Sequence, residues 1–295
     1  MKHDNLIFKP GSGSSLKDFE TGSTGRYKGK KEGDKDLLKG IEDLARMQDI
    51  LYAQDKFAIL LIFQAMDAAG KDSTIKHVMS GVNPQGCQVS SFKEPSAAEL
   101  NHDYLWRCSK ELPERGKIGI FNRSYYEEVL VTRVHPENLQ NQTLPSIPVN
   151  PEDDEKFWKQ RFEDINNFEK YLTHNGTVIL KFFLHVSPEV QKERQLDRID
   201  DSSKNWKFSI RDLNERSLWP AYMAAYEDML KHTSTNEAPW YVIPADKKWF
   251  MRTAVSHIIV DKIKSLKLHY PPLTRQQKAE LGKAREMLNN EVPKK

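Results

Sequence analysis

A lysine that follows a short loop of small residues is the feature of this sequence with the clearest chemistry. The run FAILLIFQAMDAAGKDST (residues 57–74) joins an apolar stretch to this loop, and Lys71 follows Gly70 at its end. If a buried strand ends at the loop and a helix begins after it, the loop N–H groups and the positive end of the helix attract an anion, to which Lys71 adds a full charge. The pattern predicts a phosphate-binding loop. Its predicted phosphate-binding residues are Ala68, Ala69, Gly70, Lys71, Asp72 and Ser73.

The loop departs from the GxxxxGK[ST] pattern of phosphate-binding loops at two positions. Ala65 stands in place of the first glycine, and Asp72 stands in place of the serine or threonine that binds magnesium. Small-residue turns with a lysine also occur in folds that bind no phosphate. Asp67, however, puts a carboxylate inside the loop, which is favourable if Mg²⁺ lies between the carboxylate and the phosphates. We therefore expect Asp67 to hold Mg²⁺.

Composition is that of an ordinary soluble globular protein. The 295 residues are 38% hydrophobic and 29% charged, enough to build one large α/β domain or two small ones. No apolar run approaches the roughly 20 residues that span a bilayer, and no secretory signal is apparent. Two cysteines without metal-ligand spacing fit a reducing cytoplasm. The net charge of +3 is too small to indicate nucleic-acid binding.

Short apolar runs alternate with helical patterns along the chain. The expected strands cover residues 57–63, 88–92, 117–121, 177–186 and 240–243. Apolar residues at helical spacing predict helices within residues 37–51, 72–79, 100–112, 158–172, 218–229 and 250–263. This alternation predicts an α/β fold with a parallel five-stranded sheet and helices on both faces.

The remaining segments set the expected domain organisation. Residues 1–35 are rich in Gly, Ser and Lys and are expected to form a flexible arm outside the core. The α/β domain is expected to cover residues 36–268, with a long loop at residues 134–154 and a charged, partly helical segment at about residues 188–216. The tail, residues 269–295, is charged and helix-prone, and suits docking on a partner subunit.

Charged residues follow the expected strands where a parallel sheet would bring them together. Ligands of such sheets bind at the carboxyl ends of the strands. The residues at these ends are Asp67, Lys71, Lys93, Glu94, Asn122, Arg123 and Asp246. Agreement between the loop motif and these positions predicts one site at this edge of the sheet.

The order of these parts resembles the thymidylate-kinase-like branch of the P-loop kinases, a three-layer αβα fold. In that branch a Glu-Pro pair and an Asp-Arg pair face the acceptor, and a helix with two arginines forms a lid. The corresponding residues here are Glu94-Pro95, Asn122-Arg123, Pro188-Glu189, Arg194 and Arg198. Because Arg194 and Arg198 share one helical face, the resemblance implies a lid that clamps phosphates. The same two arginines also fit a solvated helix face.

Four longer stretches resemble the family-2 polyphosphate kinases: QAMDAAGKDST, GIFNRSYYEEVLVTRVHPE, KFFLHVSPEVQKER and APWYVIPADKKWF. The resemblance covers roughly residues 36–268, and Asn-Arg in place of Asp-Arg is similar to the class III branch. It implies reversible, Mg²⁺-dependent transfer of the terminal phosphoryl group of inorganic polyphosphate to AMP and ADP. It also implies a homo-oligomer, a tetramer, and guanine nucleotides are further candidate acceptors. The composition predicts a cytoplasmic protein with neither nucleic acid nor membrane as a partner.

Phosphoryl transfer requires two anionic partners held in line, a bridging metal and positive charge on the moving group. The expected catalytic residues are Asp67, Lys71, Asn122 and Arg123. The expected nucleotide-binding residues are Lys93, Asn122, Arg123, Glu127 and Arg133, and the expected polyphosphate-binding residues beyond the loop are Lys181, Arg194 and Arg198. Two alternatives stay open: Glu127 or Glu128 pairs only with Arg133, and Lys181 pairs with an acid or reaches the surface.

Two other functions share some of these features. A nucleoside-monophosphate kinase with ATP as donor has the same fold and lid, and a regulator that binds nucleotide or polyphosphate requires no turnover. The altered loop and the four stretches favour the polyphosphate-dependent enzyme over the first. The combination of Asp67, Lys71, Asn122 and Arg123 with the lid arginines Arg194 and Arg198 argues against the second.

Overall fold

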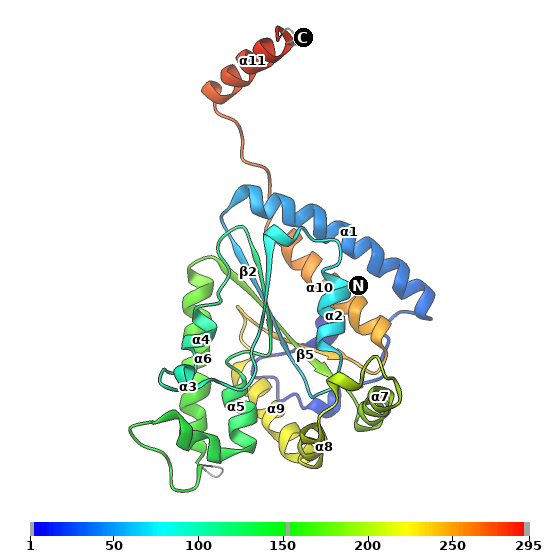
Figure 1. The fold of residues 1–295 in the computed structure, drawn as a ribbon, viewed down its shortest axis with the longest axis vertical. Helices are drawn as coiled ribbons and strands as arrows, with labels where there is room; N and C mark the ends of the chain where they lie inside the picture. Colours follow the sequence, from blue (N-terminus) through cyan, green and yellow to red (C-terminus); the bar gives the residue numbers. More distant parts are fainter. Residues whose placement is uncertain (1–2, 152–153, 292–295) are drawn as a thin grey trace.

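A six-stranded sheet runs through the centre of the molecule, which is described here from a computed structural model covering residues 3–151 and 154–291 (Figure 1). The strand order is β1-β6-β5-β2-β4-β3. The strands are β1 (Ile7–Phe8), β2 (Ala58–Gln64), β3 (Cys87–Ser91), β4 (Ile118–Asn122), β5 (Thr177–His185) and β6 (Trp240–Pro244). β2 to β6 pair in parallel, and β1 pairs antiparallel with β6. The five parallel strands are therefore confirmed, whereas the prediction of a purely parallel sheet is wrong at one edge.

The first expected strand is the centre of the sheet. β2 lies between β4 and β5, and all seven of its residues are buried. Its apolar run has no alternation with polar residues because helices cover both faces, as in other parallel sheets. The loop after β2 therefore starts from a rigid position between two neighbouring strands.

Two layers of helices cover the sheet, as Figure 1 shows. One layer contains α1 (Lys30–Gln54), α2 (Lys71–Val78) and α10 (Lys248–Ser265); the other contains α5 (Glu127–Val134), α6 (Glu155–His174) and α9 (Trp219–Thr233). α1 and α10 can pack closely because Gly33 and Gly40 of α1 have no side chains. A Cβ at Gly33 would collide with the Trp249 ring, and a Cβ at Gly40 would collide with Ser256 Oγ. The three-layer arrangement agrees with the expected fold class.

The N-terminal segment belongs to the core, so the prediction of a flexible arm outside it is wrong for the described residues. Leu6, Phe8, Leu16 and Tyr27 are all buried. Ile7–Phe8 adds the edge strand β1 to the sheet, and α1 already begins at Lys30. Isolated apolar residues among Gly, Ser and Lys gave no periodic signal for this packing. Residues 1–2 of the predicted arm lie outside the described part.

Two other segments differ in detail from the sequence predictions. The helix expected within residues 100–112 is two short helices, α3 (Ala97–Leu100) and α4 (Trp106–Ser109). The long loop at residues 134–154 contains a 3-10 helix, η4 (Pro136–Gln142), and its residues 152–153 lie outside the described part. Further 3-10 helices among the described residues are η1 (Asp4–Leu6), η2 (Leu16–Asp18), η3 (Pro84–Gly86) and η6 (Asn205–Lys207).

The segment expected to form a lid contains α7 (Pro188–Asp200) and α8 (Ile210–Ser217), which lie beyond the carboxyl ends of the strands (Figure 1). α7 begins at a typical helix start, since Ser187 Oγ accepts a hydrogen bond from the N–H of Val190 at 3.3 Å and Pro188 occupies the first position. The Ser187 cap and Pro188 therefore fix the residue at which α7 begins after β5.

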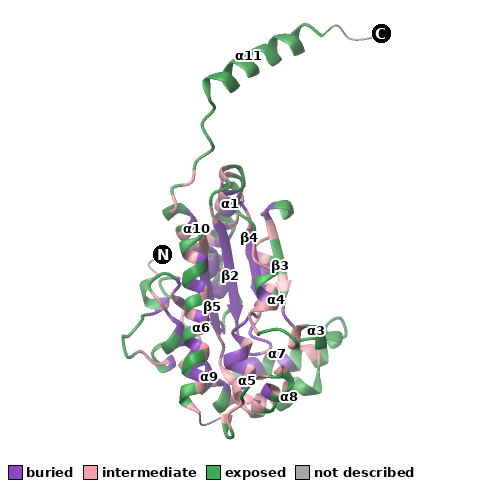
Figure 2. Ribbon diagram, turned by 90° about the vertical axis from the view of Figure 1, so that its left-hand side faces the viewer, coloured by how far each residue is buried: buried purple, intermediate pink, exposed green. Residues whose placement is uncertain are grey.

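The C-terminal tail forms α11 (Arg275–Asn289), which projects away from the body and is exposed along its whole length (Figure 2). Leu281, Met287 and Leu288 are among its exposed apolar residues. Docking of this helix on a partner subunit stays a prediction, and residues 292–295 lie outside the described part. Within residues 3–151 and 154–291, the helices lack the combination of length and apolar character that crossing a membrane requires.

Candidate active site

The loop between β2 and α2 lies at the carboxyl end of the central strand, beside the lid helices (Figure 1). Ala68 (φ 60°) and Gly70 (φ 108°) both adopt positive φ angles, a region that glycine enters readily and alanine rarely. The N–H of Ala69 donates to Met66 O at 3.3 Å, and the N–H of Thr74 donates to Gly70 O at 2.9 Å, so the turn leads directly into α2. The predicted strand, loop and helix are therefore present in sequence order.

Lys71 lies beneath this loop. Its side chain is buried, with 8% of the residue exposed, and Nζ donates a 2.8 Å hydrogen bond to Ala65 O. Burial lowers the pKa of the Lys71 ammonium, and the nearby Arg123 guanidinium lowers it further. A desolvated cation whose close partner is a neutral carbonyl gains more from an anion than an exposed lysine does. Lys71 is therefore suited to hold phosphate.

Arg123 lies between two carboxylates. Its Nη2 is 2.9 Å from Asp67 Oδ1, and its Nη1 is 3.6 Å from Glu127 Oε2. Glu127, followed by Asp67, raises the pKa of the Arg123 guanidinium. Gln64 Nε2 donates to the other oxygen of Glu127 at 3.0 Å, which fixes this carboxylate at the end of β2. A guanidinium held in place by two carboxylates is the kind of cation that can stabilise a transferring phosphate.

The first turn of α2 is joined to two other elements. Asn122 Nδ2, at the end of β4, donates a 2.7 Å hydrogen bond to Asp72 Oδ1. Ser73 Oγ accepts a 2.6 Å hydrogen bond from Arg252 Nη2 of α10. Together with the contacts above, these bonds bring Asp67, Lys71, Asp72, Ser73, Asn122, Arg123 and Glu127 to one edge of the sheet.

Lys181 is not part of this group, and the prediction that it points into a phosphate groove is wrong. The residue is fully buried, with 0% exposed, and its Nζ donates a 2.6 Å hydrogen bond to Glu169 Oε2. This is the open alternative in which the lysine pairs with an acid. Glu169 lies on α6, the helix that precedes β5 in the chain. The sequence around Lys181 therefore does not show which acid is its partner.

Arg194 has a different position from the one expected of a lid arginine. It is buried, with 7% exposed, and its guanidinium donates to the carbonyl oxygens of Ala68 (3.2 Å) and Ala69 (2.7 Å). It also donates to those of Ala245 (2.6 Å) and Asp246 (3.0 Å). The prediction that Arg194 clamps phosphates is therefore corrected: its donors hold the backbone of the phosphate-binding loop against the loop after β6.

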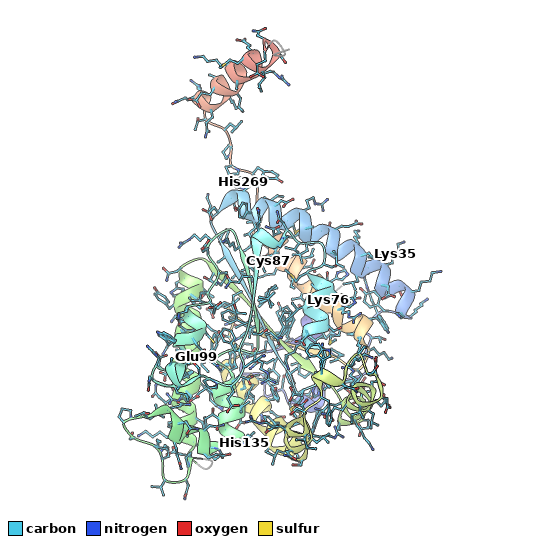
Figure 3. The ribbon with its side chains drawn as sticks, in the orientation of Figure 1. Lys35, Lys76, Cys87, Glu99, His135 and His269 are labelled. Atoms are coloured by element: carbon cyan, nitrogen blue, oxygen red, sulfur yellow. The ribbon has the colours of Figure 1, made fainter. Side chains whose placement is uncertain are left out.

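Arg198 is more accessible and belongs to the lid. Its Nη1 is 3.4 Å from Asp212 Oδ2, which joins α7 to α8. Gln191 Nε2 of α7 donates to Asp67 O at 3.0 Å, so the lid contacts the loop directly. On the other side, Nε2 of His135, labelled in Figure 3, lies 2.8 Å from Glu215 Oε2 of α8. The lid is therefore held by His135, which directly follows α5, and by the phosphate-binding loop.

Two predicted nucleotide-binding residues lie apart from this cluster. Arg133 Nη2 forms a 2.7 Å ion pair with Asp228 of α9, and the guanidinium lies 5.7 Å from the centre of the Trp158 ring. The guanidinium therefore already has an anionic partner on α9, and its contact with the acceptor stays a prediction. Lys93 is exposed after β3, and its carbonyl oxygen accepts a 2.7 Å hydrogen bond from Arg107. An acceptor role of Lys93 stays a prediction.

Two cations at the site were missed in the sequence. Arg252 binds Ser73, and Lys248 lies one helical turn before it on α10. Partial burial lowers the pKa of Lys248, and the charges of Arg194 and Arg252 lower it further. The available signal was the spacing of four residues between Lys248 and Arg252 after the end of a strand, which puts both on one helix face.

Comparison with known proteins gives a consistent result. The family model for polyphosphate kinase 2 (PPK2) matches residues 27–271. An ADP-polyphosphate phosphotransferase of Rhodopseudomonas palustris is 52% identical over 263 residues, which are 89% of this chain and 90% of that protein. An AMP/ADP-polyphosphate phosphotransferase of Meiothermus ruber is 42% identical over 272 residues, 92% and 96% of the two chains. The crystal structure of polyphosphate kinase 2 from Arthrobacter aurescens TC1 superposes with a TM-score of 0.86 at 39% identity and covers 96% of both chains. The chain therefore belongs to the polyphosphate kinase 2 family.

Proposed function

We propose that this chain transfers the terminal phosphoryl group of inorganic polyphosphate to AMP and ADP, giving ADP and ATP, in either direction. Family membership and the names of the two bacterial relatives support a polyphosphate-dependent phosphotransferase. The single observation that carries the proposal is the position of Lys71, buried beneath the loop, near the pair formed by Asp67 and Arg123.

The donor phosphates bind at the loop. Positive charge at this position comes from Lys71, from the N–H groups of the loop and from the N-terminus of α2. Lys248 and Arg252 of α10 supply further positive charge beyond the loop. These cations can pair with additional phosphates of a polymer, which a nucleotide does not have. Arg198 adds a cation from the lid. This distribution favours a long polyanion as donor.

The acceptor binds on the side of β4. Arg123 binds the phosphate of the nucleotide or the moving phosphoryl group, because its planar guanidinium can contact two oxygens at once. Glu127 and Asn122 shape this side of the site. We propose a class III activity in which a single acceptor site takes AMP or ADP, with guanine nucleotides as further candidate acceptors.

Mg²⁺ fits the residues present. Among the described residues, no group of three or more His, Cys, Asp or Glu side chains could hold a metal ion by itself. Mg²⁺ in phosphoryl-transfer sites commonly uses one or two carboxylates and completes its ligands with substrate phosphates and water. Asp67 supplies such a carboxylate beside the loop. When bound, the ion would neutralise charge on the transferring phosphates.

The assay that tests this proposal contains AMP, inorganic polyphosphate and Mg²⁺ without ATP, and follows nucleotides by chromatography. Formation of ADP and then ATP supports it. Product that appears only when ATP is added identifies a nucleoside-monophosphate kinase instead, and binding without turnover identifies a regulator. Parallel reactions with ADP, GMP and GDP define the acceptors, and a Lys71→Met variant controls for contaminating kinases.

We also propose a homotetramer in the cytoplasm. The exposed helix α11 and its apolar residues support contact with another subunit, and the free thiols of Cys87 and Cys108 suit a reducing compartment. Light scattering coupled to size-exclusion chromatography tests the tetramer, and a chain ending before Arg275 tests the role of α11. A monomeric full-length protein would exclude this assembly.

A further inference from the structure

A buried ion pair lies in the core next to the active site. Lys181, in the middle of β5, and Glu169 of α6 have 0% and 2% of their side chains exposed. Lys181 Nζ donates to Glu169 Oε2 at 2.6 Å, to Thr233 O at 2.7 Å and to the Tyr126 hydroxyl at 3.0 Å. These three bonds use all three protons of the ammonium group.

The other oxygen of the carboxylate completes a closed network. Glu169 Oε1 accepts hydrogen bonds from the hydroxyls of Tyr125 at 2.8 Å and Tyr126 at 2.7 Å. Both tyrosines are buried. Because the Tyr126 hydroxyl accepts from Lys181 and donates to Glu169, the lysine, the carboxylate and this phenol form a ring of hydrogen bonds. We call Lys181, Glu169, Tyr125 and Tyr126 the buried network.

Stability alone does not account for the buried network. Taking a lysine and a glutamate out of water is costly, and apolar residues of similar volume are often at least as stable. Burial lowers the pKa of Lys181, and Glu169 opposes this effect. The pair therefore offers no clear advantage over a hydrocarbon core, whereas its directional bonds fix the two tyrosines in one orientation.

The tyrosines belong to the turn that carries the active-site arginine. Arg123 has a φ of 65°, which is unusual for a residue with a side chain and persists only where the surroundings determine it. Its N–H donates to Phe63 O at 3.0 Å, which fixes the start of the turn. Tyr125 and Tyr126 follow after Ser124, whose Oγ accepts a 3.2 Å hydrogen bond from the N–H of Tyr126. The end of the turn is thus anchored through these groups, through the buried rings of Tyr125 and Tyr126, and through the first turn of α5.

We propose that the buried network positions Arg123 and Glu127 for phosphoryl transfer by fixing the turn between β4 and α5. The inference rests on the proposed function, and it assigns Lys181, Glu169, Tyr125 and Tyr126 as positioning residues without contact to substrate. Displacement of a reacting group by about 1 Å can cost roughly 100-fold in rate. A loss of anchoring should therefore lower kcat more than it raises KM.

The first test compares two tyrosine-to-phenylalanine variants. Tyr126→Phe removes one phenol of the network, and Tyr27→Phe removes a buried phenol that donates to Asp36 at 2.9 Å in the opposite helical layer. We expect Tyr126→Phe to lower kcat about 10- to 100-fold with KM for AMP and polyphosphate changed less than about twofold. Tyr27→Phe should lose a similar amount of thermal stability and keep its kcat. Equal kcat values for both variants would overturn the proposal.

The second test replaces the buried network with an apolar one. A variant with Lys181→Met, Glu169→Leu, Tyr125→Phe and Tyr126→Phe has no unpaired charge, so we expect it to melt near the wild-type temperature but to turn over slowly. Wild-type kcat in this variant would overturn the inference; if it does not fold, the tyrosine pair decides. The proposed function fails separately, when wild-type protein gives no product from AMP and polyphosphate.

Discussion

Asn122 Nδ2 and Asp72 Oδ1 are 2.7 Å apart, and this hydrogen bond joins the end of β4 to the first turn of α2. A carboxylate at position 122 would face the Asp72 carboxylate at this distance and repel it. The amide removes one negative charge from the acceptor side of the site and turns a repulsion into a hydrogen bond. A negative charge at position 122 should therefore weaken the binding of a nucleotide more strongly, the more phosphates the nucleotide carries.

Asn122→Asp should shift the substrate preference toward AMP. ADP carries more negative charge than AMP, so a new carboxylate beside the acceptor disfavours ADP more strongly. The measurement is the ratio of kcat/KM for AMP to kcat/KM for ADP, with polyphosphate as donor. Asn122→Ala, which loses the hydrogen bond without adding charge, is the control and should leave this ratio near the wild-type value. An unchanged ratio in Asn122→Asp would refute the charge argument.

Lys71→Met should lower kcat by about 10²–10³ while the protein remains folded. The ammonium acts on phosphate charge that develops during transfer, and removal of a buried cation also removes its desolvation cost. Lys76→Met is the matched control, because Lys76 is exposed on the same helix (Figure 3). Turnover and melting temperature are measured together. More than roughly a tenth of wild-type activity in Lys71→Met would contradict the phosphate-loop interpretation.

Asp67→Asn should move the Mg²⁺ titration of activity to higher concentration as well as lower the rate. The amide keeps the shape of the side chain but loses the charge that a hard cation prefers. Because Asp67 also pairs with Arg123, Glu127→Gln serves as the comparison, since it removes another carboxylate beside the same guanidinium. We expect the Mg²⁺ midpoint to change only in Asp67→Asn. Equal midpoints in the two variants would locate the metal away from Asp67.

The two lid arginines should respond differently to replacement. Arg194→Met leaves four backbone carbonyl oxygens of two loops without this donor, and we expect a loss of roughly 2–4 kcal/mol in the free energy of unfolding. Arg198→Ala removes one accessible ion pair and should cost less than about 1 kcal/mol. Denaturant unfolding measures both. Similar stability losses would show that Arg194 does not brace the loop.

The kinetic effect of Arg198→Ala is a separate expectation. If this cation contacts polyphosphate, its loss raises KM for polyphosphate and weakens the dependence of KM on salt. The KM is measured for wild type and variant over a range of ionic strengths. Superimposable curves would show that Arg198 acts only within the lid.

The free energy of unfolding should decrease at acidic pH, in part because of His185. Burial lowers its pKa from 6.5 to about 4, although Asp246 opposes the shift. The unfolded chain therefore takes up a proton below pH 6.5 that the folded protein does not, and the stability contribution of this group is lost as pH falls from 6.5 toward 4. His3 and His257 have pKa values lowered in the same direction by burial.

His185→Gln tests this expectation. Melting temperatures of wild type and variant are measured in steps across the interval from pH 6.5 to about 4. We expect a shallower decline in the variant, because glutamine does not titrate. Parallel declines would assign the acid sensitivity to other groups.

The phosphate-binding loop could be predicted from the sequence because its chemistry is local. The order of apolar run, small residues and lysine specifies a strand, a turn and a helix start within one short segment, and Lys71 and Asp67 come with it. Asn122 and Arg123 could be added because parallel strands end at the same edge of a sheet. These residues do lie together in the structure.

The surroundings of Lys181 and Arg194 could not be predicted in the same way. A lysine in an apolar strand indicates that some anion is near, but the carboxylate of Glu169 and the phosphates of a substrate satisfy that requirement equally well. Likewise, helical spacing puts Arg194 and Arg198 on one face without indicating which of them is buried. Both questions depend on contacts between distant parts of the chain, for which a single sequence gives no pairing signal.

The short strand β1 has a consequence for the behaviour of the whole sheet. Phe8 and Ile7 pair with Trp240 and Tyr241, so that the N-terminal segment covers an edge of β6 that would otherwise present unpaired backbone groups. Exposed edges of this kind recruit strands from other molecules and begin aggregation. Ile7 and Phe8 therefore protect this edge of the sheet from pairing with strands of other molecules, and we expect a chain without them to aggregate more readily.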